Sequence, residues 1–343
     1  MILTREAPLG EVGMLRSDDS VFLGQRLVMY RTDPAKLDSR FLLYVLLGPE
    51  LQAQIRGLGS GATVAHMRVP DCERLLVPVP SLDTQRAVAD VLASFDDLVE
   101  NSQRRISILE KMAGAIYREW FIHFRFPGHG DVRVVESSRG PVPEGWRQMP
   151  ASRAIAINPR ERVPNDVDAP FFSMADLSET GMVAFPSGTR GGGSGAKFCN
   201  GDTLFARITP CLENGKTAWV WGLADAEVAQ GSTEFVVLRG KLVGPEFTYL
   251  LARSNDFREN AIKSMTGASG RQRIRNECFD SYVVAVPPEP VQRAFEDQVR
   301  PMFRAIYALA RRNRVLHAAR NALLPRLVTG ELDVAGRVRA SIG

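Results

Sequence analysis

A strand-like run, a proline and the start of a helix occur twice in this 343-residue chain, and this duplication limits its possible folds more than any other feature. Residues 77–92 read VPVPSLDTQRAVADVL, and residues 284–299 read VAVPPEPVQRAFEDQV. At one constant offset, Pro80 aligns with Pro287 and Gln85 with Gln292. Upstream, residues 2–13 resemble 204–215, 26–31 resemble 234–239, and 41–55 resemble 247–261. Such self-similarity indicates two copies of one structural unit.

A long heptad pattern follows each proline. The apolar stripe advances by four and three residues in alternation from Val88 to Trp120 in the first copy, and from Phe295 to Leu327 in the second. This spacing keeps the stripe on one face of a helix about 50 Å long, at ~1.5 Å per residue. A stripe of that length needs a partner, so we predict that the two helices pack on each other as an antiparallel coiled coil.

Some members of the stripes are not apolar. Ser102, Asn313 and Arg320 occupy stripe positions, where polar groups can fix the register of paired helices at a cost in stability. Pro301 lies early in the second helix, and we predict that it interrupts and kinks that helix because proline removes a main-chain donor.

The segments outside the long helices have a different character. Residues 145–288 contain short β-like runs separated by Gly, Pro and Asn, together with a predicted helix over Pro245–Lys263. Residues 124–146 are rich in Gly and Pro and are typical of a linker. The sequence therefore predicts an α+β chain ordered as globule, long helix, linker, globule, long helix.

Composition and charge narrow the class of protein. The chain is 45% apolar and 24% charged, with no apolar run long enough to cross a bilayer. Its four cysteines show no CxxC spacing, which favours free thiols in the cytoplasm. The net charge of +4 is unevenly distributed, because residues 299–330 contain seven arginines and no acidic residue. Basic stretches are typical of nucleic-acid surfaces, although a solvated helix face can have the same composition.

We find no catalytic constellation in the sequence. Gly215-Lys216-Thr217 matches the end of a phosphate-binding loop, but Pro210 stands where that loop requires glycine. The four histidines lack metal-site spacing. These observations favour a non-enzymatic protein with no metal site, and a nuclease or transferase would need residues brought together only by folding.

With these motifs, nearly the whole chain resembles the specificity subunit of a type I restriction–modification system. The segments that carry the resemblance are VPVPSLDTQRAVADVL with ISILEKMAGAIYREWF (106–121), and AVPPEPVQRAFEDQV with LLPRLVTGELDV (323–334). In that family each globule is a target-recognition domain that reads one half of a split DNA target, and the two helices set the spacing and dock two methylation subunits.

The resemblance implies six regions: a partial first target-recognition domain (1–81), a spacer helix (82–126), a linker (127–144), a second target-recognition domain (145–288), a second spacer helix (289–329) and a tail (330–343). The sequence predicts an incomplete first domain, since nothing in the first copy corresponds to residues 145–201. A shortened gene product, a misassigned start, and a missing half supplied by another polypeptide are all open explanations.

The resemblance directs attention to basic and amide side chains of the second globule. Guanidinium and amide groups can bond base edges, and lysines can bond phosphates. The predicted DNA-binding residues are Arg190, Lys197, Arg207, Lys216, Arg271, Gln272, Arg273 and Arg275. The predicted surface for the methylation subunits includes Trp120, Phe121, Leu323 and Leu327, for which burial in the chain's own core is the alternative.

The function implied by the resemblance is a non-catalytic, sequence-specific DNA-recognition subunit. It would direct two methyltransferase subunits and the restriction or motor subunits to a bipartite site in double-stranded DNA. No cofactor is expected in this chain, whereas S-adenosylmethionine, ATP and Mg²⁺ are expected in the partner subunits. No membrane association is expected. The alternative is a coiled-coil assembly adaptor without sequence-specific DNA binding.

Overall fold

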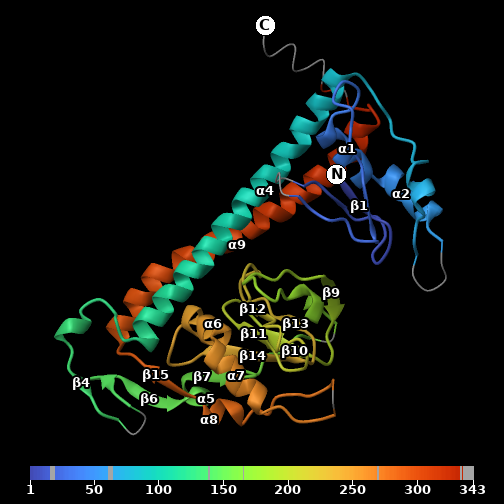
Figure 1. The fold of residues 1–343 in the computed structure, drawn as a ribbon. Coiled ribbons are helices and arrows are strands. Elements are labelled where there is room, and N and C mark those ends of the chain that lie inside the picture. The colour runs from blue at the N-terminus through green and yellow to red at the C-terminus, as the bar shows by residue number, and fades with distance from the viewer. Residues whose placement is uncertain are drawn as a thin grey trace. The chain divides into compact units, whose positions relative to one another are not determined.

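The computed structural model describes residues 1–15, 20–60, 65–137, 140–164, 166–268, 270–332 and 334. The chain forms two compact units, Met1–Ser102 with Arg312–Gly343 (unit 1) and Gln103–Arg311 (unit 2). The unit boundaries fall inside the two long helices, α4 (Leu82–Tyr117) and α9 (Glu289–Val328), so each helix contributes one part to each unit (Figure 1).

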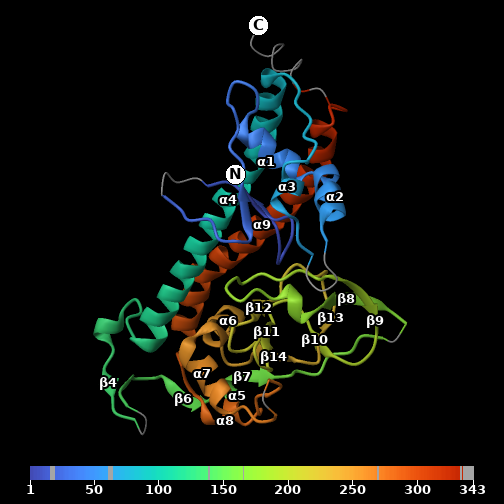
Figure 2. The ribbon, with the colours of Figure 1, turned by 45° about the vertical axis from the view of Figure 1, so that its right-hand side comes forward.

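Unit 1 combines a small antiparallel sheet with helices. The sheet has the order β2-β1-β3, made of β1 (Ile2–Thr4), β2 (Val12–Gly13) and β3 (Leu27–Met29). The shorter helices are α1 (Ser39–Leu47), α2 (Pro49–Leu58) and α3 (Val69–Cys72), visible in Figure 2. Buried side chains of α1, α4 and α9 form one core cluster, including Phe41, Val88 and Leu327.

Unit 2 contains the larger β-rich globule. One sheet has the order β12-β11-β14-β7 and a second has the order β10-β13-β8-β9. Two smaller sheets pair β15 with β6 and β4 with β5. The strands are β4 (Val134–Val135), β5 (Val142–Pro143), β6 (Arg147–Pro150), β7 (Ile155–Ile157), β8 (Asp168–Phe172), β9 (Gly188–Gly191), β10 (Ala196–Phe198), β11 (Thr203–Ala206), β12 (Thr217–Trp219), β13 (Ala229–Gly231), β14 (Phe235–Gly240) and β15 (Val283–Val286).

The helices of unit 2 cover the sheet that contains β11 and β14. Besides parts of α4 and α9, they are α5 (Ala151–Ala154), α6 (Pro245–Arg253), α7 (Asn255–Lys263) and α8 (Cys278–Ser281). Short 3-10 turns occur at His129–Asp131 and Met174–Asp176. Residues of α6, such as Phe247 and Leu251, are buried together with Phe205 and Leu238 of the sheet.

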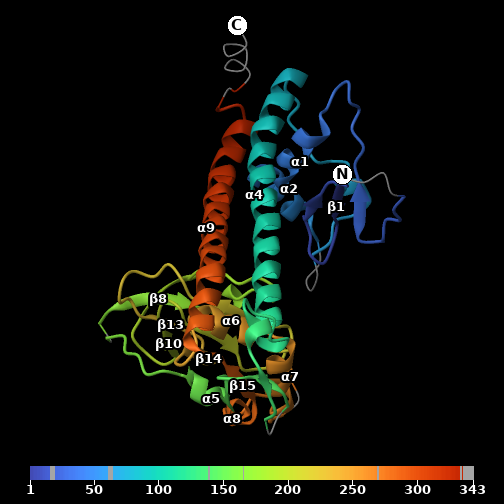
Figure 3. The ribbon, with the colours of Figure 1, turned by 90° about the vertical axis from the view of Figure 1, so that its left-hand side faces the viewer.

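The α+β class and the antiparallel helix pair predicted from the sequence are confirmed. The helices run side by side, with the start of α4 beside the end of α9 in unit 1 and the end of α4 beside the start of α9 in unit 2 (Figure 3). Every predicted stripe position is buried or half-buried. Ile108 and Val315, which lie off the stripes, are 55% and 63% exposed. No helix in the described ranges is long and apolar enough to cross a membrane.

The polar members of the stripes differ in their contacts. Arg320 forms an ion pair with Asp96 of α4, so it bridges the two helices. Ser102 donates its hydroxyl to Leu98 O at 2.9 Å, within its own helix. The buried side-chain oxygen of Asn313 has no hydrogen-bond partner among the described residues. A role of these residues in register stays a prediction.

The predicted interruption at Pro301 is wrong. Helix α9 continues without a break from Glu289 to Val328. Pro301 is exposed, while Val299 and Phe303 beside it are 0% and 1% exposed in the core. The packing of that buried face offsets the one hydrogen bond that proline removes.

Two other helix boundaries differ from prediction. The helix predicted over Pro245–Lys263 is two helices, because Ser254 is extended (φ −66°, ψ 143°). Gly48 separates α1 from α2 at the aligned position in the same way (φ −66°, ψ 151°).

The first long helix ends earlier than predicted. Its regular α-helical part ends at Tyr117 and continues as a π-helical turn over Arg118–Ile122, before the predicted end at residue 126. The segment predicted as linker contains β4 and β5, and much of the predicted tail (333 and 335–343) lies outside the described residues.

The duplicated junction has one local explanation in both copies. The Nε2 atom of Gln85 donates to Pro80 O at 2.8 Å, and that of Gln292 donates to Pro287 O at 3.0 Å. Each glutamine thereby holds the extended proline segment against the first turn of its long helix. The repeated Pro…Gln spacing therefore places the same side-chain bond at the start of both long helices.

Candidate nucleic-acid interface

Five of the predicted DNA-binding residues, Arg207, Arg271, Gln272, Arg273 and Arg275, are brought together at the end of β11. Residues 266–275, apart from residue 269, form a loop that we call the arginine loop. Its main chain bonds to the segment after β11: Ile274 N donates to Arg207 O at 2.9 Å, and Thr209 N donates to Gln272 O at 3.0 Å. These bonds place Arg207 beside Gln272 and Arg273, with Arg275 further along the same loop, although Arg207 lies about 65 residues away in sequence.

Two of these arginines are engaged within the chain. Arg273 forms a forked pair with Glu234, with its Nη2 at 2.6 Å and its Nε at 2.9 Å from the carboxylate oxygens. Hydrogen bonding from Arg273 holds the pKa of Glu234 below its usual value. Arg207 donates to Ile274 O at 3.4 Å, and its buried Nε has no partner among the described residues. Both side chains therefore stabilise the base of the arginine loop.

The remaining donors of the arginine loop are more accessible. Arg271 is exposed and has no ion pair with any residue in the described ranges, and the half-buried Gln272 likewise has no side-chain hydrogen bond there. Arg275 is exposed and its Nε lies 3.3 Å from Thr266 Oγ1. Arg271, Gln272 and Arg275 thus present guanidinium and amide donors that nucleic-acid acceptors can bond.

Arg190, Lys197 and Lys216 lie on other elements. Arg190 of β9 is exposed, and its guanidinium carbon lies 4.0 Å above the ring of Phe171, a cation–π contact that orients the side chain. Lys197 is on β10, at the opposite edge of the same sheet, and donates to main-chain carbonyls of the intervening glycine-rich loop. Lys216 precedes β12 and donates to Met174 O at 2.9 Å. Both lysines therefore have structural partners, whereas Arg190 keeps its donors free of carboxylates in the described part of the chain.

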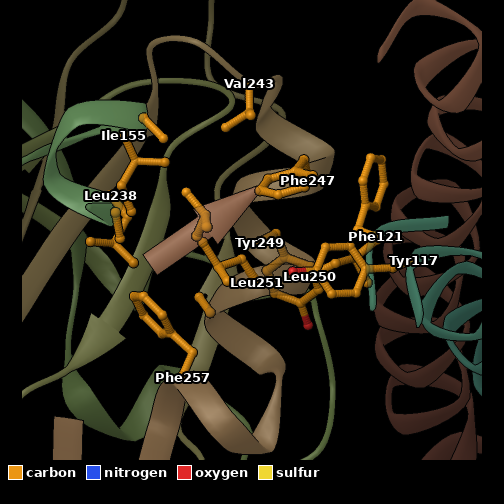
Figure 4. Close-up of a cluster of buried hydrophobic side chains, with 14 of the residues drawn as sticks. Tyr117, Phe121, Ile155, Leu238, Val243, Phe247, Tyr249, Leu250, Leu251 and Phe257 are labelled. Carbon is orange, nitrogen blue, oxygen red and sulfur yellow. The ribbon is translucent and has the colours of Figure 1, made fainter. Parts of the chain in front are cut away.

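The residues predicted to face the methylation subunits are largely buried within the chain. Trp120 and Phe121 are 6% and 5% exposed in the core of unit 2, where Figure 4 shows Phe121 and Tyr117 facing Phe247 of α6. Leu327 is 3% exposed and Leu323 half-buried in the core of unit 1. This burial agrees with the alternative, a place in the chain's own core, and contact of these residues with the methylation subunits stays a prediction.

Sequence reasoning missed a polar cluster centred on Arg239. Its Nε and Nη2 bond the carboxylate of Asp202 at 2.6 and 2.7 Å, and its Nη1 bonds Glu161 at 2.6 Å. Asp202 is fully buried. The three residues are far apart in the chain, so no motif spacing indicated the cluster. With all of its charges paired, the cluster links the loop before β11 to β14.

Unit 2 also contains a cavity of about 710 Å³ beside α4, lined by Glu110, Tyr117, Tyr249 and Arg253 among others. Burial raises the pKa of Glu110, although its carboxylate accepts a hydrogen bond from Met182 N at 2.8 Å. No group of three or more His, Cys, Asp or Glu side chains within the described ranges could hold a metal ion.

Comparison with known proteins finds similarity to type I restriction enzyme specificity subunits. Residues 1–111 match the model of the type I restriction modification DNA specificity domain. The specificity subunit of the MjaIX type I restriction enzyme of Methanocaldococcus jannaschii is 22% identical over 97% of this chain and 78% of its own length. The EcoEI specificity subunit of Escherichia coli is 30% identical over 44% of this chain and 26% of its own length.

A solved structure supports the fold. The type I restriction–modification S subunit of M. genitalium superposes with a TM-score of 0.55 at 16% sequence identity, covering 95% of this chain and 82% of that one. The family model covers the globule before the first long helix and that helix as far as residue 111, and the similarity to the MjaIX relative extends over almost the entire chain. The chain thus matches the type I specificity domain over its first 111 residues and is similar to a type I restriction enzyme specificity subunit over 97% of its length.

Proposed function

We propose that this chain is the DNA-recognition subunit of a type I restriction–modification assembly. The observation that carries the proposal is the similarity to type I specificity subunits, over residues 1–111 for the family model and over 97% of the chain for the MjaIX relative. In this role the chain binds double-stranded DNA through its globules and directs two methyltransferase subunits and the restriction subunits to a bipartite site.

The arginine loop supports this proposal in chemical terms. A guanidinium group can bond the two acceptors of guanine in the major groove, and a glutamine amide can bond adenine. Arg271 and Gln272 are adjacent, and their side chains have no partner in the described structure. We therefore assign contacts with DNA bases to Arg271 and Gln272, and contacts with the phosphate backbone of the DNA to Arg190 and Arg275. The other four predicted residues bond to groups of the chain itself, and we assign them to holding the DNA-binding surface in place rather than to contacting DNA: Arg207, Arg273, Lys197 and Lys216.

The chemistry of modification and cleavage is assigned to the partner subunits. This chain supplies recognition and assembly, and S-adenosylmethionine, ATP and Mg²⁺ act in the methyltransferase and restriction subunits. Because phosphate contacts release counterions, the affinity of the assembly for DNA is expected to fall steeply as salt concentration rises.

The test is to co-express the chain with the methyltransferase subunit encoded beside it and to select DNA from a random pool at low and high salt. A gapped motif with two fixed halves supports recognition by both units, and one half-site assigns recognition to unit 2 alone. A stable protein complex that retains no sequence-specific DNA would refute the proposal and leave the assembly adaptor.

A point variant makes the test specific to the arginine loop. Arg271→Ala is expected to weaken binding of the selected DNA by about 1–3 kcal/mol, roughly 5- to 150-fold, and to relax the preference at one base position. Arg153→Ala removes another exposed arginine of unit 2, on α5, and is expected to change binding less than 2-fold. Equal effects of the two substitutions would mean that the arginine loop only adds to the general positive charge.

A further inference from the structure

The sheet with the order β10-β13-β8-β9 carries a row of side chains on one face. Lys197 of β10 is paired with Gln230 of β13, and Gln230 is paired with Phe171 of β8. Directly paired residues point to the same face of a sheet. Arg190 of β9 lies on that face as well, because its guanidinium carbon is 4.0 Å from the centre of the Phe171 ring. Two predicted DNA-binding residues, Arg190 and Lys197, therefore share one face with Gln230.

Little within β9 itself holds this strand in place. β9 is at the outer edge of the sheet and pairs with β8 alone among the described strands (Figure 2). None of its four residues, Gly188–Gly191, is buried. Two further glycines follow it, and glycine leaves the main chain freer than any other residue does. A fixed position for Arg190 therefore requires bonds from elsewhere in the chain.

Gln230 supplies such bonds from two strands away. Its side chain is 1% exposed, and its Nε2 donates to Arg190 O and, at 2.9 Å, to Gly191 O. The glycine-rich loop that follows β9 crosses β8 and β13, because it joins β9 to β10 at the opposite edge of the sheet. Lys197 donates to two carbonyls of this loop on its far side. The start of the loop is thus held by Gln230 and its end by Lys197.

The amide of Gln230 is not placed to satisfy its own groups. Its buried Oε1 has no hydrogen-bond partner among the described residues. A buried acceptor without a partner costs free energy, which an apolar side chain of the same length would avoid. We therefore attribute the glutamine at this position to the two hydrogen bonds that it donates to β9.

We propose that Gln230 is a positioning residue for DNA binding. Its bonds hold the main chain at Arg190, the ring of Phe171 supports the Arg190 side chain, and the guanidinium faces the phosphate backbone of the DNA. Arg190 is exposed and has no ion pair in the described part of the chain, so its donors are available to phosphate oxygens. Gln230 is buried and acts through Arg190. This inference rests on the proposed function and deepens it, because it identifies what holds one of the DNA contacts.

The test uses Gln230→Met in the complex of the full chain with the methyltransferase subunit, and the DNA duplex selected with that complex. Methionine has nearly the volume of glutamine and removes both donors together with the unpaired oxygen. The affinity is expected to fall about 3- to 10-fold, and the slope of log affinity against log salt by about 0.9, the share of one phosphate contact. The same fold loss is expected on a duplex with both half-sites changed, because phosphate contacts do not read sequence.

A double variant shows whether Gln230 acts through Arg190. Arg190→Ala is expected to give the same loss of affinity and of slope. Adding Gln230→Met to it is expected to give no further loss, because both changes remove one contact. Thr203→Val is the matched control, since Thr203 of β11 is 0% exposed and its buried hydroxyl has no partner among the described residues. This control is expected to leave DNA binding unchanged.

Protein stability separates a positioning role from a merely structural one. The urea midpoint of unit 2, followed by tryptophan fluorescence, is expected to be the same for Gln230→Met and for the wild-type chain, because water can reach the main chain at the exposed Arg190. A lower midpoint, additive losses in the double variant, or wild-type affinity and slope in either single variant overturns the inference. If the wild-type complex selects no DNA, the proposed function fails as well. If the wild-type complex selects DNA and only Arg190→Ala weakens binding, the inference alone fails.

Discussion

Phe121→Ala tests whether the aromatic end of the first long helix is core or a docking surface. Phe121 is 5% exposed, and its ring packs edge-on against Phe247 at 4.8 Å and Phe295 at 4.7 Å between centroids. Tyr117, Trp120 and Trp146 complete its surroundings at 5.4, 6.5 and 5.9 Å. Truncating a phenylalanine in such a site costs about 3–5 kcal/mol, from lost burial and the cavity that remains.

The assay follows from the position of the tryptophans. All four, Trp120, Trp146, Trp219 and Trp221, lie within residues 103–311, so intrinsic fluorescence during urea unfolding reports on unit 2. With a denaturant slope of about 2–3 kcal/mol per M, the loss moves the midpoint down by about 1–2.5 M.

The control for this experiment is on the same helix. Met112→Ala, at a residue 46% exposed on α4, is expected to change the stability of unit 2 by about 0.5 kcal/mol or less. If Phe121→Ala leaves the urea midpoint unchanged and abolishes co-purification with the methyltransferase subunit, the assignment of Phe121 to the core is refuted.

Two further predictions concern charged groups. Burial raises the pKa of Glu110, so the stability that its neutral form contributes is complete below about pH 4.3 and is lost as pH rises through the raised folded-state value. Glu110→Gln should therefore leave unit 2 at least as stable at pH 7 and reduce the difference between urea midpoints at pH 5 and pH 7, and an unchanged difference would contradict this reasoning. Asp96→Ala removes the partner of Arg320 and the acceptor of the Tyr44 hydroxyl at 2.8 Å, and should destabilise unit 1 by about 1–3 kcal/mol. Amide exchange along residues 82–99 measures this effect, and Asp97→Ala, at an exposed neighbour, should leave that exchange unchanged.

Features with a local or periodic signal were predicted well. The heptad stripes placed Val88, Val99, Phe295 and Ile306 on buried faces, because burial on a helix recurs with the period of the helix itself. The internal repeat also indicated that β1 and β3 correspond to β11 and β14. It likewise aligned Gln85 with Gln292, the two glutamines that each bond a proline carbonyl. The break at Ser254 had no such signal, because the apolar residues on either side continue a helical pattern.

The candidate site was predicted as a set of residue types but not as an arrangement. Sequence identified the arginine loop from its composition. It did not distinguish Arg271 from Arg273, because Glu234, which pairs with Arg273, lies on a different strand. In the same way, Asp202 and Arg239 reveal their pairing only when β11 and β14 lie side by side.

By itself the sequence determined that the chain contains two copies of one unit, that each copy ends in a long helix with one apolar stripe, and that the two stripes pack together. These properties follow from repetition and period, which do not depend on where distant residues meet. The tertiary structure decided which basic side chains have ion-pair partners among the described residues, and that the aromatic cluster around Phe121 is core. The physical reason is that ion pairing, burial and strand pairing depend on neighbours in space, and here those neighbours lie tens to hundreds of residues apart in the chain.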